Sequence, residues 1–452
     1  MSKQIAIIAI DGSNIVSTVR STLLQKTTAT LSLAAGISAA LFSSYTAAEQ
    51  LRRVQLLEEQ VSVLEEQQAE TNRVNNVTVN GFFTLSAGMA SNDAGYAGYD
   101  KTLDYVPETK VGLQAAFEVT ESTFLIAQLV ARAEQHWRPE MEWAFLSHTF
   151  DNDLTVRAGR LRVPLYMYSD YLEVNFAQPW LRPPEEIYAV VPVSSYEGID
   201  FVYTIPFDEA DWQFQGFTGV GSDPDEETGF GTDVEYDDVM GLSTTFSYNS
   251  FSVRASYVLA TLNSGQGYVP GTALETKLVN FTDSDASFLG LGASYDDGDL
   301  LVVAEWTRSK VDGSGLATSA TNYSGNWQDV DSAYISVAYR FGNITPYVTY
   351  AIMETTDDDE RADATTQSIF DAGASAGTDP AVKANGTNQA IFDVQRSTYS
   401  AGFRYDINAN MALKFDVTYS DDFANTSGGL TGNVSQAEED TLVYTTSLNM
   451  VF

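Results

Sequence analysis

The residues in this sequence that could recognise a charged solute are its arginines, which cluster in one short stretch. The chain has 24 basic and 61 acidic residues and a formal net charge of −37, so cations are scarce. Six of the sixteen arginines nevertheless lie within one window: Arg132, Arg138, Arg157, Arg160, Arg162 and Arg182. A guanidinium group binds carboxylates and phosphates through two parallel hydrogen bonds. The window therefore predicts either recognition of small anions or ion pairs with the seven acidic residues found between 132 and 182.

Other chemistry has little support in the sequence. The chain has no cysteine, which excludes disulfides, thiolate metal sites and cysteine nucleophiles. The two histidines, His136 and His148, stand in no triad or metal motif, so we do not expect an enzyme. The negative charge disfavours nucleic acid as a partner. No cofactor is expected, although the acidic segments 223–233 and 355–363 could bind Ca²⁺ weakly.

The first 48 residues have the features of an export signal. Arg20 and Lys26 precede the apolar, small-residue stretch that ends near Ser44, and Thr46 and Ala48 suit the −3 and −1 positions of a cleavage site. A buried hydrophobic helix is the alternative interpretation. We expect residues 1–48 to be removed on export.

Residues 49–75 are predicted to form a short amphipathic helix. Val54, Leu57, Val61 and Leu64 follow the a and d spacing of a heptad repeat. Two apolar heptads are too few for a stable isolated helix. The pattern therefore predicts a short periplasmic coiled coil between chains, with a solvated linker as the alternative.

From Val77 onward the apolar period changes to two, which is typical of β-strands. The segment FSVRASYV, for example, places Phe251 and Val253 on one face and Ser252 and Arg254 on the other. Sixteen such segments are predicted, near 77–90, 109–119, 123–134, 141–150, 153–161, 197–205, 211–221, 237–248, 251–262, 287–296, 299–309, 329–341, 344–353, 393–406, 411–420 and 440–452.

The connections between these segments alternate between tight and long, and the longest covers 354–392. An even number of antiparallel strands, with short turns at one end and long loops at the other, describes a transmembrane β-barrel. The predicted fold is therefore all-β, a sixteen-stranded barrel over residues 76–452. A barrel of this size encloses an aqueous channel. Its apolar faces would contact outer-membrane lipid and lipopolysaccharide, and its polar faces would contact small solutes.

The C-terminal strand carries a separate assembly signal. Tyr444, Leu448, Met450 and Phe452 alternate with smaller residues up to the last position. This pattern resembles the segment by which the barrel assembly machinery recognises outer-membrane barrels. Because lipid requires every backbone group to be paired, we expect this strand to pair with the first one, near 77–90.

The connection at about 162–196 has an unusual composition for an exposed loop, with many aromatic residues and five prolines. Apolar loops of this length pack against other structure, and the inside of the barrel offers such a surface. The stretch GRLRVPLYMYSDYLEVNFAQPWLRPPEEIY resembles the corresponding part of DcaP-like trimeric outer-membrane porins of Gram-negative bacteria. The motif-level likeness covers 157–203. The resemblance implies a homotrimer with a periplasmic coiled coil, a third loop that narrows the pore, and a leaning toward small anions.

Strand alternation places further cations on the lumen faces of the predicted barrel. The predicted pore or solute-binding residues are Arg132, Arg157, Arg160, Arg162, Arg182, Arg254, Arg340, Arg404 and Lys414. Arg160, Arg162 or Arg182 is expected to lie across the lumen from the wall cations. Because rings of Arg or Lys favour anions in pores, the sequence predicts a passive porin for small hydrophilic solutes that prefers carboxylates or phosphate-like anions. Three alternatives stay open: arginines that only brace acidic residues, a general cation-preferring porin, and a structural barrel that organises the envelope.

Overall fold

The protein is described here by a computed structural model covering residues 76–191, 194–223, 233–264, 267–268, 277–279, 283–312, 329–357, 394–424, 426, 428–430 and 439–452. The predicted export signal, 1–48, and the predicted coiled coil, 49–75, lie outside these residues. Among the residues described, no helix is long and apolar enough to cross a membrane.

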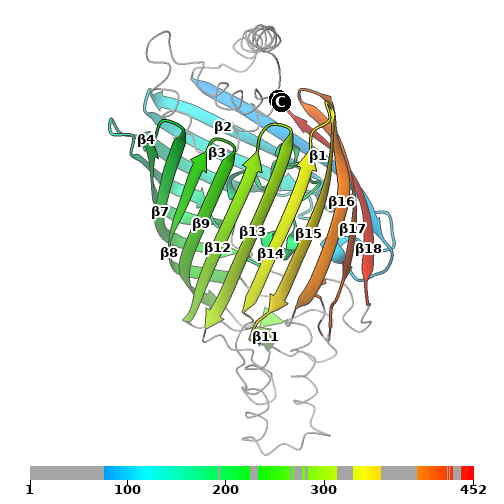
Figure 1. The fold of residues 1–452 in the computed structure, drawn as a ribbon. Helices are drawn as coiled ribbons and strands as arrows, with labels where there is room; N and C mark the ends of the chain where they lie inside the picture. The colour runs from blue at the N-terminus through cyan, green and yellow to red at the C-terminus, as the bar shows by residue number, and fades with distance from the viewer. Residues whose placement is uncertain are drawn as a thin grey trace, which may run out of the picture.

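Sixteen antiparallel strands form one closed barrel (Figure 1), and two further short strands, β10 and β11, pair separately. All sixteen barrel strands lie where the alternating pattern predicts them, with each end within three residues of its expected place. The elements are β1 Val77–Ala90, η2 Tyr96–Gly98, β2 Lys110–Thr120, β3 Thr123–Arg132, β4 Pro139–Thr149, β5 Thr155–Arg162, η3 Ser169–Tyr171, η4 Asn175–Ala177, α4 Glu185–Tyr188, β6 Ser195–Pro206, β7 Ala210–Asp223, β8 Val234–Tyr248, β9 Phe251–Ser264, β10 Gly267–Tyr268, β11 Lys277–Val279, β12 Ser284–Asp296, β13 Leu300–Asp312, β14 Val330–Tyr339, β15 Ile344–Thr355, β16 Gln395–Asn408, β17 Met411–Asp421 and β18 Thr441–Val451.

The barrel closes between its first and last strands. Phe82 of β1 is paired with Val451 of β18. The Gly81 N–H donates to the Phe452 carbonyl at 2.7 Å, and the Phe452 N–H donates to the Gly81 carbonyl at 2.9 Å. The C-terminal aromatic residue therefore ends a strand whose backbone is fully paired. The predicted role of this strand in assembly stays a prediction.

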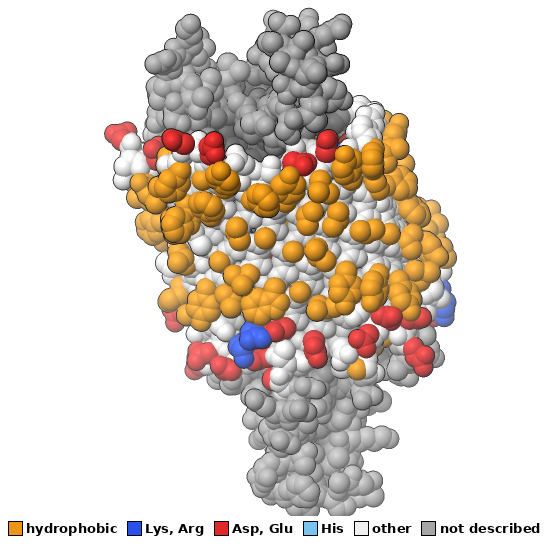
Figure 2. Space-filling model, in the orientation of Figure 1, with side chains coloured by type: hydrophobic (Ala, Val, Ile, Leu, Met, Phe, Trp, Pro, Cys, Tyr) orange, Lys and Arg blue, Asp and Glu red, His pale blue; other side chains and the backbone are white. Residues whose placement is uncertain are grey.

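The outer surface of the barrel is an apolar belt. Figure 2 shows hydrophobic side chains in a band between two rims that carry acidic residues. On β9, Val253 and Tyr257 are 52% and 50% exposed, whereas Ser256 is 3% exposed on the inner face. A soluble sandwich would bury the apolar faces and expose the polar ones. The observed arrangement is the one that a lipid environment requires.

The connection between β5 and β6 lies inside the barrel. We call residues 163–191 the inward loop; it contains η3, η4 and α4. Leu165, Trp180 and Ile187 of this loop are buried in the same hydrophobic cluster as Tyr334 of the barrel wall. The apolar composition of the loop therefore serves a core that fills part of the lumen.

Three laterally paired glycines lie on the lumen side of the strands that flank the inward loop. Gly159 of β5 is paired with Gly198 of β6, which in turn is paired with Gly219 of β7. Gly159 has a φ of +137°, and a Cβ at this position would lie 2.3 Å from the Ala144 carbonyl oxygen. The backbone at Gly159 therefore requires glycine.

We predict that Gly159→Ala destabilises the barrel by roughly 1–3 kcal/mol, because alanine strains this backbone conformation and meets backbone atoms. Gly216→Ala is the matched control, since a Cβ at Gly216 meets nothing within 4 Å. To measure the effect, samples are heated to increasing temperatures and run on a denaturing gel, on which the folded barrel migrates faster than the unfolded chain. The unfolding temperature of Gly159→Ala should be lower than that of Gly216→Ala, and equal unfolding temperatures would contradict the prediction.

Candidate functional site

Lys414 of β17 fastens the inward loop to the barrel wall. Its side chain is fully buried, and Nζ donates to the carbonyl oxygens of Asn175, Gln178 and Trp180. The latter two contacts measure 2.8 and 2.5 Å. Three acceptors match the three N–H bonds of an ammonium group. Lys414 therefore organises the loop around η4.

Two further wall cations bind loop carbonyls. Arg254 of β9 donates to the Pro164 carbonyl at 2.9 Å. Arg404 of β16 donates to the Phe176 carbonyl and, at 3.2 Å, to the Gln178 carbonyl. A loop inside a barrel has backbone acceptors that water reaches poorly, and an unpaired buried carbonyl is costly. These cations supply the missing donors.

Glu305 of β13 holds the opposite side of the loop. One carboxylate oxygen accepts from the Met167 N–H at 2.8 Å, and the other accepts from the hydroxyls of Tyr188 and Tyr334. The Trp180 indole N–H donates to the Ser336 hydroxyl at 2.6 Å. The loop is thus fixed to β13 and β14 as well as to β16 and β17.

Glu186 of α4 joins the inward loop to a second inward-packed segment. Its carboxylate forms an ion pair with Arg396 at 2.8 Å and accepts a hydrogen bond from the Thr398 hydroxyl at 2.7 Å. The Tyr96 hydroxyl, from the connection between β1 and β2, lies 3.4 Å from the same oxygen. Tyr96 and Tyr99 are both buried. The connection around η2 therefore packs against the inward loop from the long-loop end of the barrel.

A cavity of about 220 Å³ remains between the inward loop and the wall near β2 and β3. Its lining is dominated by charged residues of both signs. The residues that line it are Glu108, Thr109, Lys110, Arg132, Glu134, Leu172, Glu173, Arg182, Pro183, Glu185, Tyr188 and Ala189. The narrowed part of the lumen is therefore mixed in charge, not purely basic.

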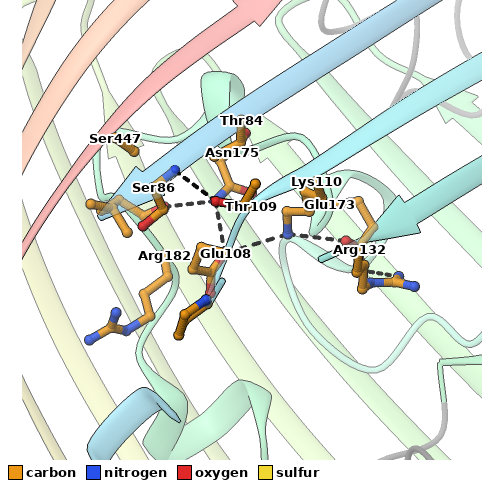
Figure 3. Close-up of polar contacts among 12 residues, drawn as sticks. Thr84, Ser86, Glu108, Thr109, Lys110, Arg132, Glu173, Asn175, Arg182 and Ser447 are labelled. Carbon is orange, nitrogen blue, oxygen red and sulfur yellow. Dashed lines mark hydrogen bonds and ion pairs between the residues drawn. The ribbon is translucent and has the colours of Figure 1, made fainter. Parts of the chain in front are cut away.

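Ion pairs connect the loop to the wall on one side of this cavity. Figure 3 shows Glu173 of the loop between Lys110 and Arg132, at 3.1 and 2.9 Å. Arg132 also meets Glu142, which pairs with Arg162 at 2.8 Å. Burial by itself would raise the pKa of the Glu173 carboxyl, but the cations of Arg132, Lys110 and Arg162 hold it well below its ordinary value. Glu173 is therefore a charged anchor.

Two other carboxyls of the cavity are in a different electrostatic situation. Burial and the nearby charge of Glu108 raise the pKa of Glu134 to about 7. Burial also raises the pKa of Glu185, although Arg182 opposes the shift. Glu134 lies in the connection between β3 and β4, outside the strands. Its charge therefore changes near neutral pH.

The remaining predicted pore residues do not gather at one place. Arg157 forms a buried pair with Asp200, with Nε 2.8 Å from one carboxylate oxygen. Arg340 pairs with Asp296 at 2.6 Å beyond the end of β14. Arg160 lies on the outer face, where it pairs with Glu197 and donates to the Met141 carbonyl at 2.7 Å. The expected place of Arg160 in the pore is wrong, because the alternation that turns Arg157 inward turns Arg160 outward.

The expected opposition of cations across the lumen is also replaced by a different arrangement. Arg162 and Arg132 share the carboxylates of Glu142 and Glu173. Arg254 holds the loop backbone and Arg340 lies at the short-turn end. Arg182 of the inward loop lines the cavity, whereas Arg160 and Arg162 do not.

Several functional residues were missed by reasoning from the sequence. Lys110 and Arg396 lie on lumen faces of β2 and β16, and strand alternation would have indicated both, because Arg396 shares the parity of Arg404. Glu305 had no signal of its own, since its importance comes from what the loop places beside it.

Calcium binding stays an expectation. Most of the acidic segments 223–233 and 355–363 lies outside the described residues. Within the described part of the chain, no group of three or more His, Asp or Glu side chains could hold a metal ion.

Solved structures of outer-membrane proteins share this fold. The outer membrane channel DcaP of Acinetobacter baumannii has a TM-score of 0.51 and 12% identity, covering 83% of this chain and 97% of that one. OmpF of Salmonella typhi, in complex with daunomycin, has a TM-score of 0.53 and 15% identity, covering 84% and 98%. OmpT of Vibrio cholerae has a TM-score of 0.50 and 13% identity, covering 84% and 99%. The sequence matches no family model and no curated protein. These likenesses support the DcaP-like resemblance at the level of the fold.

We predict that Lys414→Met loosens the inward loop. The buried Trp180 carbonyl loses its charged donor at a cost of about 1–3 kcal/mol, and the Asn175 and Gln178 carbonyls keep only their 3.2 Å contacts with the Gln178 N–H and Arg404. Amide hydrogen exchange of residues 163–191, followed by mass spectrometry, should become faster. Lys310→Met, which changes an exposed lysine paired with Asp329 at 2.5 Å, is the control. Unchanged exchange in the Lys414 variant would contradict the anchoring role.

Proposed function

We propose that this protein is an outer-membrane porin through which small hydrophilic solutes diffuse passively. The observation that carries the proposal is a closed barrel with an apolar belt whose lumen is narrowed by an anchored inward loop. The loop leaves a cavity lined by charged side chains, which suits hydrated solutes and not lipid. The short turns and the C-terminus then belong to the periplasmic end. The apolar belt would contact lipid and lipopolysaccharide, and the C-terminal strand would contact the barrel assembly machinery.

We further propose a weak preference for anions. Arg254 and Lys414 donate to neutral carbonyls, and no ion pair is found for either among the described residues. Arg254 therefore adds positive charge to the lumen wall, which Asp170 and Glu305 nearby partly offset. The network around Glu173 adds no net positive charge, because the carboxylates of Glu108, Glu140, Glu142 and Glu173 offset the three cations Lys110, Arg132 and Arg162. The acidic residues of the outer rim are exposed, and salt screens them beyond about 8 Å.

Selectivity in a planar bilayer under a salt gradient tests this proposal. The wild-type reversal potential should indicate weak anion preference, and Arg182→Gln should shift it toward cations. A unit charge about 8 Å away in a water-like medium changes an ion's energy by about 0.5 kcal/mol, or roughly two-fold in permeability ratio.

Arg160→Gln is the matched control for this experiment, because Arg160 lies on the outer face and should leave the reversal potential unchanged. A cation-selective wild type would favour the alternative of a general cation-preferring porin. An absence of conductance would favour a structural barrel.

We also propose that the barrel assembles as a homotrimer through the outer face of β1 to β5. Trp and Tyr belong at membrane interfaces, yet the outward positions of these five fully described strands hold neither. Trp212, Tyr257 and Tyr350 are exposed on the rest of the belt. The outward ion pair of Arg160 and Glu197 also suits a protein contact better than lipid. The number three rests on the DcaP-like resemblance.

A bulky residue on this face should prevent assembly. Ala127 is an outward residue of β3, and we predict that Ala127→Trp yields monomers because flat packing against another barrel is lost. Ala333→Trp places the same side chain on the outward face of β14 and should leave trimers intact. Sedimentation in detergent measures the mass. Trimers in both variants would place the contact elsewhere.

A further inference from the structure

Glu134 is an acidic residue of the cavity that has no cation of its own. It lines the cavity, and among the described residues we find no ion pair for its carboxylate. Glu108 and Glu185 disfavour its charge, while Lys110 and Arg132 favour it more weakly than burial opposes it. An ammonium group delivered by a solute would find an acceptor here.

Arg182 is a basic group that lines the same cavity. Its Nε lies 3.7 Å from a Glu185 oxygen, which is longer than a hydrogen bond. Its Nη1 is buried and has no hydrogen-bond partner. The guanidinium carbon lies 5.4 and 5.7 Å from the ring centres of Tyr96 and Tyr99. The two rings hold the guanidinium in place without using its donors.

The other charges of the cavity are already matched. Glu173 has both Lys110 and Arg132 as partners. Glu108 lies 3.5 Å from Lys110 and accepts from the Asn175 amide at 2.9 Å. Glu185 also lines the cavity and has Arg182 as its ion-pair partner. The cavity thus keeps Glu134 without an ion pair among the described residues, and Arg182 with only the 3.7 Å contact to Glu185.

We propose that this cavity binds small zwitterionic solutes of the α-amino acid type, with the solute carboxylate at Arg182 and its ammonium group at Glu134. The proposal rests on the porin function and names a solute class for the same lumen. A volume of about 220 Å³ holds roughly seven water molecules at about 30 Å³ each. A solute of six to ten heavy atoms has a comparable size.

A zwitterion suits the cavity better than an ion of one sign. An anion at Arg182 would leave Glu134 unpaired and would be repelled by it, whereas a cation at Glu134 would leave Arg182 with only its 3.7 Å contact to Glu185. A zwitterion makes two charge-assisted hydrogen bonds at once. It also leaves the net charge of the site unchanged, so it avoids the cost of concentrating one sign of charge in a poorly hydrated space.

Three matched probes separate these contributions: L-alanine, propionate, which lacks the ammonium group, and ethylammonium, which lacks the carboxylate. Binding to the purified full-length protein in detergent is measured by titration calorimetry at pH 8. Alanine should bind at least roughly ten-fold more tightly than either single-charge probe, since each charged hydrogen bond contributes enough for such a factor. Equal binding of alanine and propionate would overturn the proposal.

Substitutions test which residue binds the ammonium group of alanine and which binds its carboxylate. Glu134→Gln should remove the advantage of alanine over propionate, and Arg182→Gln should remove its advantage over ethylammonium. Arg182→Lys keeps the charge and should retain part of the affinity, which guards against a folding defect in the first variant. Glu118→Gln is the control, because Glu118 lies farther along β2 and does not line the cavity. A loss in the control equal to that in Glu134→Gln would overturn the assignment.

The pH profile gives an independent readout. Because the pKa of Glu134 is about 7, alanine affinity should be full above this pH and should fall as the pH drops and the carboxyl becomes neutral. The charged groups that face Glu134 are Glu108 and Lys110 beside β2, Arg132 at the end of β3 and Glu185 of α4. The profile of Glu134→Gln should be flat between pH 6 and 8, and a wild-type profile in that variant would overturn the role of Glu134.

Conductance in potassium chloride keeps the two proposals distinguishable. Conducting channels without selective alanine binding would overturn the zwitterion site and leave the porin function standing. Selective alanine binding by a protein that never conducts would support the site and overturn the porin function on which its role in transport rests.

Discussion

The need to pair every backbone N–H and C=O group governs this structure. In lipid no water is available for an open sheet edge, so the sixteen strands close on themselves through β1 and β18. The same need determines how the chain ends, because Phe452 pairs its backbone with Gly81 in both directions. Successive side chains of each strand point to opposite faces of the barrel. Apolar residues occupy the outward positions, and polar residues occupy the positions between them, which face the lumen. A polar interior is therefore a consequence of closure as much as of function.

The inward loop brings the same problem into the lumen. Its residues turn through short irregular elements, so many of its carbonyls have no partner within the loop. The barrel wall supplies the donors, chiefly through Lys414, Arg404 and Arg254. Cations that the sequence suggested as solute-binding residues therefore also hold the inward loop in place. In the proposed porin the charge of Arg254 would act on ions in transit, because a carbonyl dipole accepts a hydrogen bond without neutralising a full charge.

Reasoning from the sequence was most reliable where a repeated pattern was involved. Period-two alternation and the alternating loop lengths located all sixteen strands, because both follow from one constraint that acts on every strand. The ion-pair partners of individual charged residues could not be predicted from the sequence. Alternation tells that Arg157 and Arg132 face inward, but not that Asp200 or Glu173 lies beside them. Those contacts depend on the path of a loop that has no repeat. Arg160 was predicted to line the pore because it lies in the arginine-rich window. The alternation along β5 already places its side chain on the outer face.

The difference between matched and unmatched charges is the last consequence of this architecture. A net charge of −37 describes the whole chain and does not describe the field inside the lumen. Inside the lumen, charges act over short distances and are weakly screened. The network around Glu173 holds at least as many carboxylates as cations, so it braces the wall and adds no net positive field. Glu134, from the connection between β3 and β4, and Arg182, from the inward loop, line one cavity. Glu134 has no ion pair among the described residues, and Arg182 has only the 3.7 Å contact with Glu185. In the proposed porin, selectivity therefore depends more on which charges are left without close partners than on how many arginines the barrel contains.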